Sequence, residues 1–310
     1  MFDYTSANLH SYCMEDFKKF LELVDLQIPQ ESEKMKVKLE NLQITFYPNS
    51  NKLNISNSLH KFYNRTYADL IIDGNHNDFC YSNFISLMFM FSEFYFERDL
   101  KDFELSTKFE TALNIDVGGY KPMDIMERYL SYQSHNSIVA FKTIEPWGGA
   151  IGKPTTMKAF MSDYQVKCYN KSAESKLTGI NLMRLELVYG QLRKLRSVLG
   201  LGVNAEITLE NLTQIESWKA LGSYIMNCYN NIKKIPLTER NLTIDELNKI
   251  YAHCHKGLKI DISKHLSRHH YSKHMDECKE VYNRIFKSKD NYHNVIEQKI
   301  LNKIEYLWKN

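Results

Sequence analysis

Residues 165–171 and 181–188 are two consecutive segments whose side chains alternate as in a β-strand, and this pair constrains the fold more than any other feature. In the first segment, alternation places Lys167, Tyr169 and Lys171 on one face, because successive side chains of a strand point to opposite sides. That face is too polar to belong to a hydrophobic core. The first segment therefore predicts an exposed sheet surface with a phenol between two cations.

The second segment adds to this polar surface. Alternation places Arg184 and Glu186 on one face, and the apolar Met183, Leu185 and Leu187 on the other. If the two strands are neighbours, one side of the sheet is apolar and the other carries a tyrosine, three cations and a carboxylate.

These residue types together indicate chemistry on phosphate esters. A tyrosine hydroxyl is a poor nucleophile near neutral pH, since its unperturbed pKa is about 10. The adjacent Lys171 would favour the phenolate of Tyr169 and bind phosphate oxygens, and Glu186 could hold a divalent metal that polarises a phosphodiester. Attack by Tyr169 would then form a phosphotyrosine link to nucleic acid, and Arg184 would orient Glu186 or bind the DNA backbone.

The motif Tyr169-Asn170-Lys171, followed by Arg184-Leu185-Glu186, resembles the signature of rolling-circle replication initiators of filamentous phages and related plasmids, including the phage gene II type of nickase. The resemblance covers residues 55–200. It implies an endonuclease that nicks one origin strand, stays attached to the 5′ phosphate and later rejoins the strand. The implied partner is origin DNA, single-stranded or hairpin, with a host helicase, single-strand-binding protein and a second copy of the chain as further candidates.

Residues 108–117 form a further predicted strand, on which Glu110, Asn114 and Asp116 share a face. In the resembled family a strand of this kind ends in Ile-Asp and supplies a metal-binding carboxylate, which corresponds here to Ile115-Asp116. Alternation adds Glu110 as a further candidate ligand. With Glu186, these acids would suit Mg²⁺ or Mn²⁺, which prefer oxygen ligands; the alternative is an exposed strand with ordinary solvated acids.

Four cations are candidates for contacts with DNA phosphates: Lys61, Lys153, Lys167 and Arg193. Lys153 lies in a glycine-rich segment that is not a P-loop, because Gly148 and Gly152 are one residue too close and Pro154 stands where Ser or Thr is required. His60 is better explained by packing than by a catalytic role.

Composition places the chain among ordinary globular proteins. Of its 310 residues 43% are hydrophobic and 25% charged, which argues against disorder, and the net charge of +3 permits nucleic-acid binding without requiring it. Six scattered cysteines fit the reducing cytoplasm of a bacterial host cell. We expect no secretion signal, and no membrane span, since the longest apolar run, residues 84–96, is too short.

The overall pattern predicts an α+β fold: an antiparallel-sheet catalytic nicking domain with covering helices over residues 1–203, and a helical DNA- or partner-binding domain over residues 204–310. Further predicted elements are a hairpin of strands at 42–47 and 53–63 joined by a turn at 48–51, and strands at 67–73 and within 137–162. The predicted helices are one from about 82 to 96, one at 123–132, and four or five segments in the tail. The tail's histidines and cysteines, from His253 to Cys278, indicate a surface or DNA-facing helix rather than a zinc site.

Two other functions use the same surfaces. A non-enzymatic origin-binding initiator would give Tyr169 no special role. A plasmid-transfer relaxase shares the chemistry but is disfavoured, because the His-x-His metal motif of that group has no counterpart in a suitable cluster.

Overall fold

The computed structural model describes residues 1–30, 32–67, 74–134, 137–144, 156–238, 240–288 and 291–310. The chain forms two compact units, each assembled from distant segments: residues 1–113, 186–224 and 304–310 make the first, and residues 114–185 and 225–303 make the second. Neither unit ends at the boundary predicted between residues 203 and 204. The formation of an independent domain by residues 204–310 stays a prediction.

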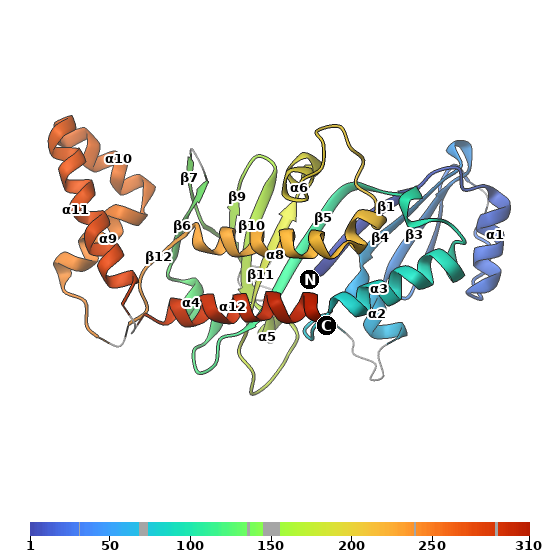
Figure 1. The fold of residues 1–310 in the computed structure, drawn as a ribbon, viewed down its shortest axis with the longest axis horizontal. Coiled ribbons are helices and arrows are strands. Elements are labelled where there is room, and N and C mark those ends of the chain that lie inside the picture. The colour runs from blue at the N-terminus through green and yellow to red at the C-terminus, as the bar shows by residue number, and fades with distance from the viewer. Residues whose placement is uncertain (31, 68–73, 135–136, 145–155, 239, 289–290) are drawn as a thin grey trace. The chain divides into compact units, whose positions relative to one another are not determined.

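The first unit is built on a sheet with strand order β2-β3-β4-β1-β5-β11. Its strands, the last two shared with the second unit, are β1 (Phe2–Leu9), β2 (Met35–Leu39), β3 (Leu42–Tyr47), β4 (Lys52–Ser58), β5 (Phe103–Asp116) and β11 (Leu182–Tyr189). Its helices are α1 (Met14–Leu23), α2 (Leu59–Thr66), α3 (Tyr81–Met90), α6 (Leu192–Val198) and α7 (Leu209–Thr213), with short turns at Pro48–Ser50, Phe91–Tyr95 and Leu100–Asp102. Figure 1 shows β1, β3 and β4 side by side.

Aromatic side chains fill the core of this unit. The Phe2 ring lies 4.7 Å from the rings of both Phe84 and Trp218, and all three side chains are buried. Phe84 comes from α3, so its contact with Phe2 holds that helix against β1. Burial of such large apolar side chains is the main stabilising contribution here.

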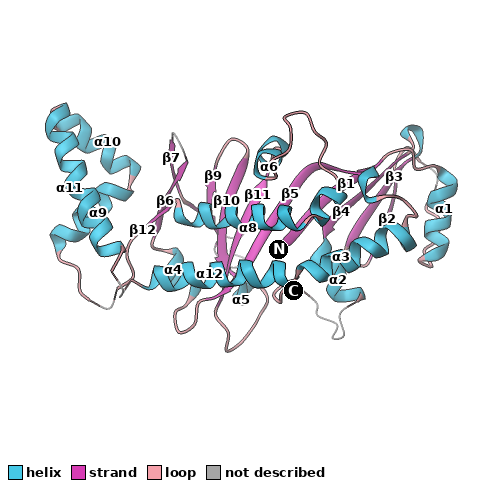
Figure 2. Cartoon of the chain, viewed as in Figure 1, coloured by secondary structure: helices cyan, strands magenta, loops and turns pink. Residues whose placement is uncertain are grey.

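The second unit contains strands in the order β11-β10-β9-β8 and a separate sheet ordered β12-β6-β7. Its strands are β6 (Tyr129–Ser134), β7 (Ser137–Ala140), β8 (Lys142–Ile144), β9 (Thr156–Phe160), β10 (Tyr164–Asn170) and β12 (Ile232–Lys234). Its helices are α4 (Pro122–Met126), α5 (Lys171–Glu174), α9 (Ile244–Cys254), α10 (Lys256–His265) and α11 (Arg268–Phe286), while α8 (Ile215–Asn230) and α12 (Tyr292–Lys309) contribute to both units. Figure 2 shows α9, α10 and α11 grouped together.

The predicted α+β class, with an antiparallel sheet and C-terminal helices, is confirmed, since the strand pairs with described registers are antiparallel. The hairpin predicted over residues 42–63 is present over residues 42–58 as β3 and β4, with Asn51 in the left-handed region at φ 45°. The predicted helix after residue 82 is α3, and it continues into a π-helical turn over Phe91–Tyr95.

Several predicted elements are wrong. The strand expected over 53–63 ends at Ser58, because the Ser58 hydroxyl accepts a hydrogen bond from the Lys61 amide and begins α2. The helix expected at 123–132 stops at Met126, and the chain continues as strand β6. The tail is not wholly helical, because its segment β12 pairs with β6. The strand expected at 67–73 lies almost entirely outside the described residues.

Candidate metal centre and tyrosine strand

Three buried carboxylates meet on three adjacent strands of the first unit. Asp3 lies on β1, Glu110 on β5 and Glu186 on β11, and one ligand atom from each lies within 4.8 Å of the others. Their exposed fractions are 8%, 9% and 1%. This carboxylate cluster unites two of the predicted metal ligands with a residue that the sequence pattern did not single out.

The strand pairing explains how Asp3 reaches the cluster. Strand β1 pairs with β5, opposing Phe2 to Thr111 and Thr5 to Phe109, with a register shift between these pairs. Such an irregularity redirects side chains locally. Asp3 lies within this irregular stretch of β1, next to the strand that carries Glu110.

Hydrogen bonds hold the Asp3 carboxylate. Its Oδ1 accepts a hydrogen bond of 3.2 Å from the Ser58 hydroxyl and another from the side-chain amide of Asn75. The loop that carries Asn75 is fixed in turn, because Asn64 donates to the Gly74 carbonyl at 2.9 Å and to Asn77 at 2.7 Å. These contacts orient one carboxylate of the cluster before any ligand binds.

His60 belongs to the same polar network and not to the carboxylate cluster. Its Nε2 lies 2.8 Å from Oδ1 of Asn77, and its ring stacks on Phe79 with centroids 5.0 Å apart. This buried position agrees with the expected packing role.

The charges at the cluster affect one another. Burial raises the pKa of Glu110, and the nearby Glu186 charge raises it further, although Lys108 acts in the opposite direction. Lys108 Nζ lies 2.5 Å from Oε1 of Glu110 and 4.6 Å from the centroid of the Tyr4 ring. Burial lowers the pKa of Lys108, but the hydrogen bond to Glu110 and the Glu110 charge raise it by more. The pKa of Lys108 is therefore raised overall. A buried set of three carboxylates fits a hard divalent cation, which would offset their mutual repulsion, so this donor set could hold a metal ion.

Asp116, the third predicted ligand, is placed differently. It is exposed at the end of β5 in the second unit, where its carboxylate accepts a 2.8 Å hydrogen bond from the Gly118 amide. Lys299 donates to its backbone carbonyl at 2.8 Å. Asp116 is not a member of the carboxylate cluster, and its role as a metal ligand stays a prediction.

Tyr169 lies on β10 of the second unit, opposite Thr156 of β9. Its side chain is 7% exposed, and Lys167 Nζ lies 4.8 Å from the centroid of its ring. The predicted pairing of this phenol with a lysine on the same strand face is therefore present. The face is more buried than the alternation of polar residues indicated.

Lys171 does not continue that strand. Asn170 accepts a hydrogen bond from the Ala173 amide at 3.0 Å and begins α5, of which Lys171 is the first residue. The Lys171 side chain is buried and forms an ion pair with Glu174. The expectation that Lys171 lies on the strand face beside Tyr169 is thus wrong, because a local cap ends the strand one residue earlier.

Arg184 is also buried, and its guanidinium donates to Oδ1 of Asn114 at 3.3 Å within the second unit. Among the predicted DNA contacts, Lys61 on α2 and Lys167 are half-buried, and Arg193 on α6 is exposed. Lys153 lies outside the described residues. The catalytic and DNA-binding roles of these residues stay predictions.

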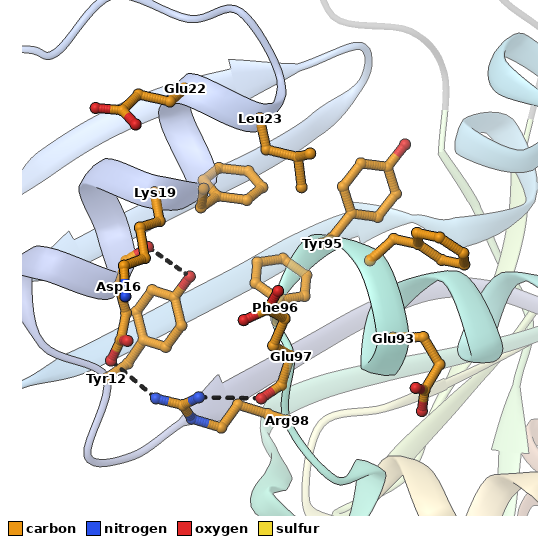
Figure 3. Close-up of a pocket in the computed structure, with 12 residues that line it drawn as sticks. Tyr12, Asp16, Lys19, Glu22, Leu23, Glu93, Tyr95, Phe96, Glu97 and Arg98 are labelled. Atoms are coloured by element: carbon orange, nitrogen blue, oxygen red, sulfur yellow. Dashed lines mark hydrogen bonds and ion pairs between the residues drawn. The ribbon is translucent and has the colours of Figure 1, made fainter.

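A pocket of about 450 Å³ lies elsewhere in the first unit (Figure 3). Arg98 is one of the lining residues, paired with Asp16 at 2.8 Å and donating to the Glu97 carbonyl at 3.0 Å. The residues that line it are Tyr12, Asp16, Lys19, Phe20, Glu22, Leu23, Glu93, Phe94, Tyr95, Phe96, Glu97 and Arg98. Four carboxylates against two cations make this pocket unsuited to phosphate groups.

Comparison with solved structures gives a match to the structure of a rolling circle replication initiator protein from Geobacillus stearothermophilus. The two chains share 13% sequence identity, the match covers 78% of this chain and 88% of the other, and the TM-score is 0.39. No protein-family model matches the sequence, and no curated protein matches it. Among the described residues, no helix has both the length and the apolar character needed to cross a membrane.

Proposed function

We propose that this protein initiates rolling-circle replication by nicking one strand of an origin and rejoining it through a 5′-phosphotyrosine intermediate. The observation that carries the proposal is the meeting of Asp3, Glu110 and Glu186 on three adjacent strands. Two of these acids were predicted as metal ligands, and Glu186 lies in the Arg-x-Glu motif that resembles phage and plasmid initiators. Burial of three acids in one place is costly, and a bound cation would offset their mutual repulsion.

In this proposal Tyr169 is the nucleophile. Its phenolic oxygen attacks the phosphorus, the bond to the 3′ oxygen breaks, and the departing 3′ oxygen takes a proton. Lys167, beside the ring, favours the ionised phenol, because a neighbouring cation stabilises the phenolate. A 3′ hydroxyl reverses the step and reseals the strand.

The carboxylate cluster would hold Mg²⁺ or Mn²⁺, which when bound would polarise a phosphodiester and stabilise negative charge on it. Ser58 and Asn75 orient Asp3 for that purpose. Lys108 balances part of the cluster charge through its ion pair with Glu110. Origin DNA is the proposed substrate, in single-stranded or hairpin form.

The test is covalent capture. The protein is incubated with Mn²⁺ and a pool of single-stranded DNA of random sequence, labelled at the 3′ end, and is then separated on a denaturing gel. We expect labelled DNA to stay on the wild-type protein and to be lost with Tyr169→Phe, because the 3′ fragment is the part that becomes attached.

Tyr164→Phe is the matched control on the same strand. It removes the 2.9 Å hydrogen bond between Tyr164 and Tyr132, so it should lower stability but leave the adduct. An adduct that persists in Tyr169→Phe would assign the nucleophile to another residue. Absence of any adduct from the wild-type protein would favour a non-enzymatic initiator.

A further inference from the structure

In the second unit, α10 and the first half of α11 form a long segment that packs into no core. Residues 255–277, here called the α10–α11 arm, include no buried residue. The base of α11 is different, because Tyr282 and Ile285 pack with Ile250 and Cys254 of α9 in a hydrophobic cluster. The arm is therefore anchored at its base and exposed along the rest of its length.

Positive charge is concentrated on this arm. Residues 255–274 of the arm contain five lysine or arginine side chains and one carboxylate, a formal charge of +4, and Asp276 and Glu277 at its end bring the whole arm to +2. The whole chain carries +3, so the residues outside 255–274 together sum to −1. Five histidines lie in the same twenty-residue stretch: His255, His265, His269, His270 and His274.

Most of the arm's cations are not neutralised locally. Lys264 is paired with Asp261 at 3.0 Å. For Lys256, Lys259, Arg268 and Lys273, no carboxylate lies within ion-pair distance among the described residues. Of these four cations, Lys256, Arg268 and Lys273 are exposed and Lys259 is half-buried. A set of accessible cations of this kind is typical of a surface that binds phosphate groups.

Like charges also gather at the side of the arm. Burial lowers the pKa of His253 to about 4, and the charges of Lys259, Lys233 and Lys279 lower it further. Burial lowers the pKa of Lys259 too, and the Lys233 charge adds to this effect. These three lysines, from α10, β12 and α11, repel one another, and an anion bound between them would relieve the repulsion.

The shape of α10 favours duplex DNA over an acidic protein surface as the partner. A helix that docks on a protein needs one exposed face, whereas a helix that enters the major groove needs most of its circumference free. No residue of α10 is buried, and the major groove, about 12 Å wide, matches a helix with its side chains. The exposed Leu258, Ile260 and Leu266 offer apolar contacts of the kind made with thymine methyl groups.

We infer that the α10–α11 arm binds duplex DNA, with α10 in the major groove and its cations on the flanking phosphates. The inference rests on the proposed function, since it supplies the nicking site with a means of holding the duplex around an origin. It also assigns a task to helices that contribute no residue to the carboxylate cluster.

The experiment measures binding of the full-length protein to a labelled mixed-sequence duplex of about 30 base pairs, roughly three helical turns, by fluorescence anisotropy over a series of salt concentrations. The variant combines Lys256→Gln, Lys259→Gln, Arg268→Gln and Lys273→Gln. The matched control combines Lys18→Gln, Lys19→Gln, Lys36→Gln and Lys38→Gln, which removes the same charge from exposed positions of α1 and β2.

We expect the arm variant to bind the duplex at least roughly tenfold more weakly and its slope of log K against log salt to fall by about 3 to 4, because each lost phosphate contact removes nearly one unit. The control should stay within about twofold of the wild-type affinity, apart from the small effect of net charge. Both variants should keep the wild-type circular dichroism spectrum, since the substituted side chains support no core.

Equal losses in the arm variant and the control would overturn the inference, as would no loss in either. If the arm variant lost affinity only for a single strand of the same sequence and not for the duplex, the partner of the arm would be single-stranded DNA instead of duplex DNA. Failure of the proposed function is seen separately: a wild-type protein that forms no covalent adduct but binds the duplex through the arm would reject nicking and retain the arm.

Discussion

The side-chain amide of Asn75 donates a hydrogen bond to Oδ1 of Asp3, the same oxygen that accepts from the Ser58 hydroxyl at 3.2 Å. Two donors therefore fix a carboxylate that belongs to the carboxylate cluster. Asn75 is buried, and its loop is held by Asn64, so this orientation is built into the fold. The Asn75 amide is a positioning group for the metal centre that we propose.

Asn75→Ala should weaken Mn²⁺ binding by about 10- to 100-fold, because partners of this kind fix the orientation of a ligand. Isothermal titration calorimetry measures the change. Asn54→Ala is the control, since Asn54 donates to the Ala7 carbonyl on the same strand as Asp3 but not to Asp3 itself. An equal loss of affinity in both variants would show a general effect on β1.

Glu110→Gln should make the metal-free protein more stable above about pH 5. The pKa of Glu110 in the folded protein is raised above its unfolded value, about 4.3, by burial and the Glu186 charge. The folded state therefore favours the protonated acid, so its ionisation lowers stability as pH rises through the folded pKa. Thermal unfolding of the metal-free wild type and variant across this pH range measures the difference.

The same substitution should reduce the stabilisation by Mn²⁺, which for an intact site is about 2.7 kcal/mol at a metal concentration 100 times Kd. In the wild type, this stabilisation should grow with pH because the metal competes with the proton on Glu110. Glu104→Gln, on the same strand, should respond to metal as the wild type does. A full metal response in Glu110→Gln would remove Glu110 from the site.

His60→Ala should reduce stability by about 1–3 kcal/mol and leave covalent adduct formation intact at temperatures where the variant is folded. The substitution removes the 2.8 Å contact with Asn77 and the stacking on Phe79. Chemical denaturation gives the change in stability, and the denaturing gel gives the adduct. Loss of the adduct in a folded variant would assign His60 a part in the reaction.

Lys234→Met should change how stability depends on pH. Lys234 is buried, its ammonium donates to the Tyr229 carbonyl at 2.6 Å, and burial lowers its pKa to about 7. Its unfolded pKa is about 10.4, so the folded state penalises the charged form. Relative to the variant, the wild type should therefore be least stable below pH 7. Its free energy of unfolding should rise by several kcal/mol relative to that of the variant as pH rises from 7 toward about 10.

Urea denaturation of both proteins at a series of pH values measures this difference. Lys287→Met replaces an exposed lysine and should show the pH dependence of the wild type. A constant difference between wild type and Lys234→Met would mean that Lys234 stays in one protonation state over the whole range.

Local features of the sequence were sufficient to predict the strands that carry the candidate metal ligands and the tyrosine. Alternation assigned Glu110, Tyr169 and Glu186 to strands, and all three lie on strands of the structure. The turn at Pro48–Ser50 indicated the β3–β4 hairpin through its local residue preferences. The predictions were wrong where one N-cap residue ends a strand and begins a helix. Ser58 caps α2 and Asn170 caps α5, and in both places a continuing strand was expected. Both are favoured N-cap residues, so that signal was present in the sequence.

Asp3 is the residue that the sequence could not single out. It is one acid in a mostly buried strand, Phe2–Leu9, and no motif surrounds it. Its importance comes from the pairing of β1 with β5 and of β5 with β11, which joins residues that are far apart in the sequence.

The sequence by itself determined which residues alternate on strands and which types of chemistry they offer, because these depend on the backbone period and the side chains alone. Only the tertiary structure decided that Asp3 joins Glu110 and Glu186, that Lys171 is buried in an ion pair, and that the α10–α11 arm is exposed. The physical reason is that strand order, register and burial arise from contacts between distant segments, whose combined free energy no local pattern contains.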